Sequence, residues 1–112
     1  MSRIVAYVPD LMDRSRMTAL GDVAFVPDPA SLAARAAAEG AEVVVVDLTR
    51  PGALEAVAAV EGRVVGFANH TERELMDAAR AAGCDTVVAR SAFFSRLREL
   101  VGPAQRESEG DG

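Results

Sequence analysis

Five short apolar runs alternate with alanine-rich segments along the chain, and this alternation predicts the architecture. The apolar runs have the length and composition of buried strands; they cover residues 4–8, 23–26, 41–46, 64–68 and 86–89. The other segments space their apolar residues as helices do, and glycines end several of them; they cover residues 10–20, 29–39, 51–60, 71–82 and 92–101. Strands that alternate with helices imply right-handed crossovers and a parallel sheet with helices on both faces.

Polar residues mark the points at which several helices are expected to begin. Asp28 precedes Pro29, which suits the first helical position, so Asp28 is expected to be an N-cap. Residues 71–74 have the form of a capping box, with Thr71 as the cap. Ser91 is expected to cap a single last helix that ends at residue 101.

The run of four valines that begins at Val43 is the most informative segment. It is typical of a strand buried on both faces, and Asp47 follows where this strand would leave the core. For five strands the common arrangement is a three-layer, doubly wound α/β sheet with the flavodoxin-like order 2-1-3-4-5. In such sheets, ligands gather at the carboxyl ends of the strands. This order would bring six polar residues to one rim: Asp10, Asp13, Asp47, Asn69, His70 and Arg90.

Composition limits the classes of function. The 112 residues carry a formal net charge of −5, which argues against binding to nucleic acid or to anionic membrane surfaces. No run approaches the roughly 20 apolar residues of a membrane span, and the N-terminus lacks the pattern of a signal peptide. No glycine-rich loop follows the first strand, which argues against a dinucleotide or P-loop site. All 12 basic residues are arginines.

The single cysteine, Cys84, cannot form an internal disulfide, which fits a reducing, cytoplasmic location. It is either a small buried hydrophobic residue or a reactive thiol. The uninterrupted alternation of elements indicates one domain over residues 1–102. Residues 103–112 are polar and acidic, and we expect them to form a flexible tail.

This order of elements, with an aspartate at the end of the third strand, resembles the receiver domain of bacterial response regulators over residues 3–101. The resemblance implies a signalling module whose phosphoacceptor corresponds to Asp47. In a phosphorylatable receiver, an acidic pair after strand one binds Mg²⁺ together with that aspartate. A serine or threonine after strand four senses the phosphoryl group, and a lysine after strand five neutralises its charge.

The chain matches this set of residues only in part. Asp10 lies between Pro9 and Leu11, so the adjacent acidic pair after strand one is missing. An alanine and Asn69 stand where the hydroxyl residue would be, and Arg90 replaces the lysine. These departures indicate a degenerate receiver, or pseudo-receiver, in which ordinary phosphotransfer is not expected.

Asp47 has two readings. It either accepts a phosphoryl group or helps to bind a cation, or it is a helix-capping or ion-paired aspartate. A guanidinium is always charged and its planar fork suits a carboxylate. We therefore expect Arg90 to contact Asp47 directly or through a water molecule, and so to occupy the pocket that metal and phosphate would need.

The other rim residues also have alternative roles. Asp10 either binds a metal with Asp47 or caps the first helix, and Asp13 is expected in the first turn of that helix. His70 is an acid, a base or a phosphate acceptor, or else a solvated loop residue. Asn69 either contacts a ligand or shapes the turn.

From these observations we expect a non-catalytic, receiver-like signalling or protein-interaction module that is not an enzyme and needs no cofactor. The resemblance implies a protein partner or a homodimer, through the face built by strands four and five and the last helix. Of the two aromatic residues there, Phe93 and Phe94, one is expected in the core and the other near the surface. Two alternatives stay open: an atypical receiver phosphorylated on Asp47 with Mg²⁺, and a small-ligand binder at the same rim.

Overall fold

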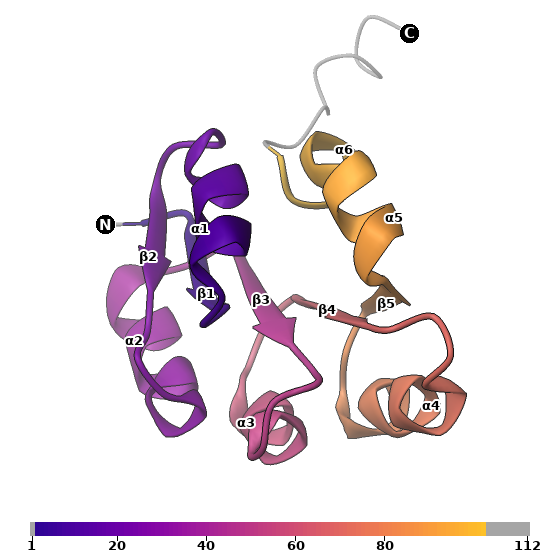
Figure 1. Ribbon diagram of the computed structural model, residues 1–112. Coiled ribbons are helices and arrows are strands. Elements are labelled where there is room, and N and C mark those ends of the chain that lie inside the picture. Colours follow the sequence, from indigo (N-terminus) through magenta and orange to yellow (C-terminus); the bar gives the residue numbers. More distant parts are fainter. Residues whose placement is uncertain (1, 103–112) are drawn as a thin grey trace, which may run out of the picture.

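The computed structural model describes residues 2–102, which form a five-stranded parallel sheet between two layers of helices (Figure 1). The strand order β2-β1-β3-β4-β5 confirms the predicted topology. The strands are β1 Ile4–Tyr7, β2 Val23–Phe25, β3 Val43–Asp47, β4 Val64–Ala68 and β5 Thr86–Ala89. The helices are α1 Leu11–Thr18, η1 Pro29–Ser31 (a 3₁₀ turn), α2 Leu32–Glu39, α3 Ala53–Ala59, α4 Arg73–Ala82, α5 Arg90–Ser95 and α6 Leu97–Val101. The expected tail, residues 103–112, lies outside the described residues.

Each face of the sheet buries its own cluster of apolar side chains. Val44 and Val46 of β3 pack with residues of α2, α3 and α4. Val43 and Val45 pack on the opposite face, with residues of α1, α5 and α6. Because side chains alternate along a strand, a strand covered on both faces needs apolar residues at successive positions. This two-sided burial explains the unbroken valine run.

The last helical segment differs from the prediction. The sequence predicts one helix over residues 92–101, but the structure has α5 and α6, separated at Arg96 with φ −118° and ψ 30°. The Ser95 hydroxyl donates to the Ala92 carbonyl at 3.2 Å, a bond of the kind that competes with the helical backbone. Ser91 is not the cap, because β5 runs directly into α5 at Arg90 without a loop.

Two further helix starts were predicted, and one of them is wrong. The Asp28 carboxylate accepts the Ser31 amide at 2.9 Å, so Asp28 is an N-cap, although it caps η1 before the chain enters α2. Thr71 is not a cap, because α4 begins two residues later. The Glu72 carboxylate reaches back and accepts the Asn69 amide at 3.1 Å, which closes the turn without help from Thr71.

Burial decides the role of the single thiol. Cys84 is buried in the cluster under α2, α3 and α4, which confirms that it is a small hydrophobic residue of the core. Burial, with a smaller effect of the neighbouring Asp85 charge, raises the pKa of the Cys84 thiol to about 11. The reactive thiolate is therefore scarce at neutral pH. In the part of the chain that the structure describes, no helix is long and apolar enough to cross a membrane.

Candidate functional site

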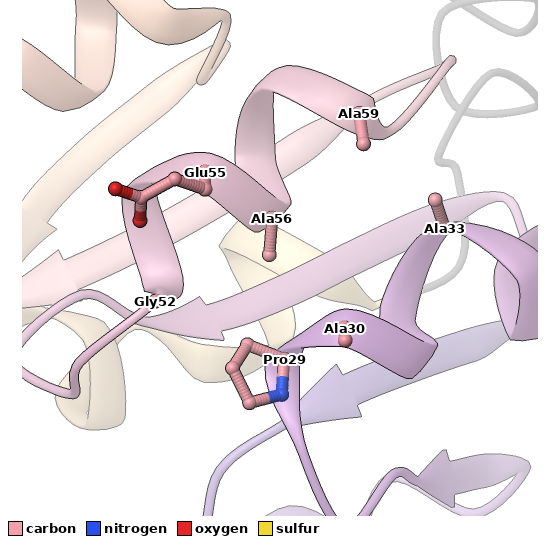
Figure 2. A pocket seen from close by; sticks show the side chains of 7 residues that line it. All are labelled: Pro29, Ala30, Ala33, Gly52, Glu55, Ala56 and Ala59. Carbon is pink, nitrogen blue, oxygen red and sulfur yellow. The ribbon is translucent and has the colours of Figure 1, made fainter.

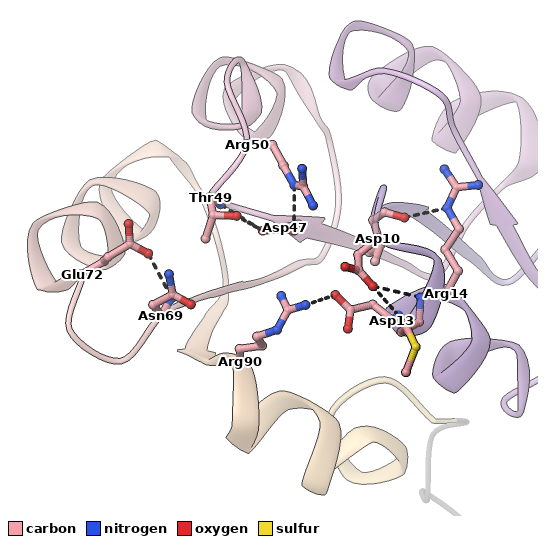
Figure 3. A network of polar contacts seen from close by, with 11 residues as sticks. Asp10, Asp13, Arg14, Asp47, Thr49, Arg50, Asn69, Glu72 and Arg90 are labelled. Carbon is pink, nitrogen blue, oxygen red and sulfur yellow. Dashed lines mark hydrogen bonds and ion pairs between the residues drawn. The ribbon is translucent and has the colours of Figure 1, made fainter.

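The polar residues predicted for the rim lie at the carboxyl ends of the strands, as the strand order requires (Figure 3). Asp10 follows β1, Asp47 ends β3, Asn69 follows β4, and Arg90 follows β5. Two carboxylate residues of this rim are buried: Asp47 is 0 % exposed and Asp13 is 3 % exposed. A buried carboxylate needs hydrogen bonds or a nearby cation, so the partners of these two residues define the site.

The Asp47 carboxylate is held by the loop that follows it. Its Oδ1 atom accepts the Thr49 amide at 3.0 Å and the Thr49 hydroxyl at 2.6 Å. Its Oδ2 atom lies 3.3 Å from Nε of Arg50, whose side chain is 41 % exposed. Asp47 is thus a hydrogen-bonded, ion-paired aspartate, which was one of its two predicted readings.

The backbone next to Asp47 is fixed by a close approach between two strands. Leu48 is buried and its amide donates to the Phe67 carbonyl of β4 at 2.9 Å. A Cβ atom added at Gly66 would lie only 2.8 Å from Cδ1 of Leu48. Glycine at position 66 therefore makes room for the Leu48 side chain, which anchors the loop that carries Thr49 and Arg50.

The second buried carboxylate forms an ion pair between elements that are distant in sequence. Nη2 of Arg90 donates to Oδ2 of Asp13, which joins the start of α5 to α1 across 77 residues. The guanidinium carbon of Arg90 also lies 5.6 Å from the centre of the Phe67 ring. Burial raises the pKa of Asp13, although the Arg90 charge opposes the shift; the charges of Asp10 and Asp47 add to it.

The expected contact between Asp47 and Arg90 is not a direct one, since neither residue is a hydrogen-bond or ion-pair partner of the other in the structure, and its water-bridged form stays a prediction. Arg90 is engaged by Asp13, and Asp47 takes its cation from Arg50, three residues along the same loop (Figure 3). A partner three residues away needs little ordering of the chain. Arg16 stands at the same spacing from Asp13, but Asp13 pairs with Arg90 across the rim, and the Arg16 guanidinium lies over the Phe94 ring. The sequence analysis missed both Arg50 and the pairing of Asp13.

Asp10 caps α1, as one of its two readings predicted. Its Oδ1 atom accepts the amides of Met12 at 2.9 Å and of Asp13 at 3.1 Å. The hydrogen bond from the Asp13 amide is the largest cause that lowers the pKa of Asp10, and the charges of Arg90 and Arg50 act in the same direction. The carboxylate thus complements the partial positive charge of the helix N-terminus.

The rim carboxylates are each engaged by other groups of the protein in this arrangement. Asp10 is directed at backbone amides, Asp13 at Arg90, and Asp47 at its own loop. Over residues 2–102, no group of three or more His, Cys, Asp or Glu side chains is placed to hold a metal ion.

The residues after β4 take part in the rim only through the backbone. The Asn69 carbonyl accepts the Glu72 amide at 2.9 Å, and its own amide donates to the Glu72 carboxylate, so Asn69 shapes the turn. His70 is exposed in the loop before α4, which agrees with its reading as a solvated residue. Neither side chain is among the hydrogen-bond partners of the Asp47 carboxylate in the part of the chain that the structure describes.

Comparison with known proteins shows which solved structures have a similar fold. No protein-family model matches the chain, and no curated protein matches it. Among solved structures, the chain is similar to the crystal structure of a response regulator from Hahella chejuensis, with a TM-score of 0.76 and 16 % sequence identity. The match covers 90 % of this chain and 92 % of that one. The chain therefore has the receiver-like, flavodoxin-type α/β fold.

Proposed function

We propose that this chain is a receiver-type signalling module that acts through protein contacts, without Mg²⁺-dependent phosphorylation of Asp47. The fold supports the class, because the sheet order and most of the chain's length agree with a response regulator. The arrangement of the rim residues supports the second part of the proposal, that Asp47 is not phosphorylated in the Mg²⁺-dependent way. In this proposal the protein is not an enzyme and needs no cofactor.

The main support for the proposal is that the Asp47 carboxylate is buried and already hydrogen-bonded and ion-paired. Both oxygens are engaged by Thr49 and Arg50, and the residue has no exposed surface. A phosphoryl donor must reach one of these oxygens in line, so the Thr49 hydroxyl and the Arg50 guanidinium would first have to leave. Each departure exposes a buried carboxylate without its partner, which is costly.

The second argument concerns the cations that phosphotransfer requires. The developing charge on a transferring phosphoryl group needs a metal ion and fixed positive side chains. Here the acidic residues after β1 are engaged by α1 amides and by Arg90. Arg90, which stands where a receiver has lysine, is thus already neutralised by Asp13.

The partner of this module would be a protein, in a reducing, cytoplasmic setting that suits the one buried thiol. The face of β4, β5 and α5 is the surface proposed for it, including a homodimer. Phe93 is fully buried there, whereas Phe94 is partly buried and lies under Arg16, 5.2 Å from its guanidinium carbon. Because Arg16 is exposed and a cation–π contact at the surface is weak, a partner can displace it from the Phe94 ring at small cost.

Incubation of the full chain with acetyl phosphate and Mg²⁺, followed by intact-mass spectrometry, tests the proposal. We expect an unchanged mass under conditions in which a receiver with the complete set of residues becomes phosphorylated. A phosphoryl adduct that forms in the wild type and is absent from Asp47→Asn would show an atypical working receiver instead. Asp47→Asn keeps the oxygen that Thr49 contacts, so it is a conservative control.

A further inference from the structure

A groove lined mostly by alanines runs between α2 and α3, on the face of the sheet opposite to α1 (Figure 2). It consists of two adjoining hollows of about 380 and 540 Å³, which share Ala33 and Ala59. In Figure 2, Ala56 and Ala59 project from α3 toward Pro29 and Ala33. Because most of its lining residues are alanines, whose side chains are short, the groove has room for larger side chains from outside.

The charged residues that line this groove are both acidic. Glu55 borders the first hollow and Glu61 borders the second. Both residues are exposed, and within residues 2–102 neither forms an ion pair. The groove therefore suits an apolar segment that carries positive charge.

The chain itself has one surface segment of that kind. Leu11 and Met12 are 76 % and 70 % exposed and are the large apolar side chains most exposed on the described surface. They lie in the first turn of α1, whose later residues include Arg14 and Arg16. The one acidic residue within α1, Asp13, is buried against Arg90. Arg14 is half-buried and its Nε donates to the Val8 carbonyl, whereas Arg16 is exposed above the Phe94 ring, so Arg16 supplies most of the positive charge on the outer side of α1.

We propose that the groove between α2 and α3 receives α1 of a second copy of this chain. Leu11 and Met12 would enter beside Ala33 and Ala59, and the exposed Arg16 would face the acidic groove residues Glu55 and Glu61. Such burial removes exposed apolar surface from water, and the charges set the direction of docking. This inference does not depend on the proposed signalling function.

The two surfaces lie on opposite faces of one molecule, so the contact is head to tail. A contact of this kind leaves a free helix at one end and a free groove at the other, and it propagates into chains or closes into rings. A symmetric pair through β4, β5 and α5 would instead stop at two copies. The sizes of the assemblies therefore separate the two modes.

Disulfide trapping tests the contact directly. Equal amounts of Leu11→Cys and Ala59→Cys are mixed and oxidised at neutral pH, where the buried Cys84 thiol does not compete. We expect the mixed disulfide to form several-fold faster than in a control mixture of Leu11→Cys with Ala78→Cys, an exposed alanine on α4. Equal rates in the two mixtures would overturn the proposal.

Sedimentation of the intact chain, in a concentration series up to about 1 mM, gives an independent test. We expect assemblies larger than a dimer, which disappear in the double variant Leu11→Ser/Met12→Ser and in Ala59→Arg. The matched control Ala78→Arg should associate as the wild type does. A wild-type chain that stops at monomer or dimer, or large assemblies that persist in Ala59→Arg, would overturn the proposal and leave the groove to a different occupant.

Discussion

Arg90 pairs with Asp13 and not with Asp47, and this choice organises the rim of the sheet. The pair joins the first residue of α5 to α1, while Asp47 is satisfied within its own loop by Thr49 and Arg50. The rim is thereby divided into two separately neutralised carboxylates. A receiver that transfers phosphate needs these groups to converge on one metal and one phosphoryl group.

The first prediction concerns the strength of this pair. Arg90→Gln leaves the Asp13 carboxylate buried without a cation, so we expect the free energy of unfolding to fall by about 1–3 kcal/mol. This loss is smaller than for a fully buried ion pair, because the Arg90 side chain is partly exposed to water. Asp13→Asn should cost less, because the neutral amide is easier to bury. Urea unfolding of both variants and of the double variant measures the coupling. Strictly additive losses would show that the pair contributes nothing of its own.

The second prediction follows from the raised pKa of Asp13. Between the unfolded value, near 3.8, and the higher folded value, the native state binds more protons than the unfolded state. The contribution of Asp13 to stability therefore falls as the pH rises through that window. Unfolding free energies measured across the window should show this slope in the wild type, relative to Asp13→Asn. If the free energy of unfolding instead rose with pH in this window, the Arg90 charge would lower the pKa of Asp13 by more than burial raises it.

The third prediction concerns the close approach of Gly66 to Leu48. The methyl group of Gly66→Ala would overlap the Leu48 side chain, and we expect a destabilisation of about 1–3 kcal/mol from the strain. Leu48→Ala removes the obstructing atoms but leaves a cavity, and should cost about 2–5 kcal/mol by itself. Thermal and urea unfolding should show that the double variant loses less than the sum of the two single losses. Additive losses would contradict the contact.

The fourth prediction tests the cap of α1. The lowered pKa of Asp10 means that its ionised form stabilises the fold above the ordinary value of 3.8, and that this contribution is lost as the pH falls through the lowered folded value. At pH 7 we expect Asp10→Ala to lower the urea midpoint, whereas Asp10→Asn, which can still cap, should lower it less. The difference between wild type and Asp10→Asn should shrink in acid. A stability difference between wild type and Asp10→Asn that stays the same in acid would show that the charge of Asp10 is not its cause.

Much of the fold could be predicted because the signals that define it are local or periodic. The valine run before Asp47 identifies a strand covered on both faces, and the alternation of elements identifies a parallel sheet. The strand order was expected because it is the common arrangement for five such strands, and the structure has it. The capping role of Asp10 also follows from its position before the first helical turn. For the strand and for the cap, neighbouring residues determine the outcome.

The partners of the buried carboxylates could not be predicted in the same way. Arg50 and Arg90 both follow strands at the rim, and only the positions of their side chains decide which carboxylate each one meets. The break at Arg96 depends on one hydroxyl bond from Ser95, which competes weakly with a continuous helix. Small energy differences of this kind do not leave a pattern in the sequence.

The most direct test of the central claim is a two-dimensional NMR titration of the full chain with Mg²⁺ and then beryllofluoride, a mimic of the phosphoryl group. Because both Asp47 oxygens are held by the loop, we expect the amide signals of Thr49 and Arg50 and the Nε signal of Arg90 to stay in place. Shifts of these signals that require both additives, and that vanish in Asp47→Asn, would contradict the account and show that the pocket opens to accept a phosphoryl group.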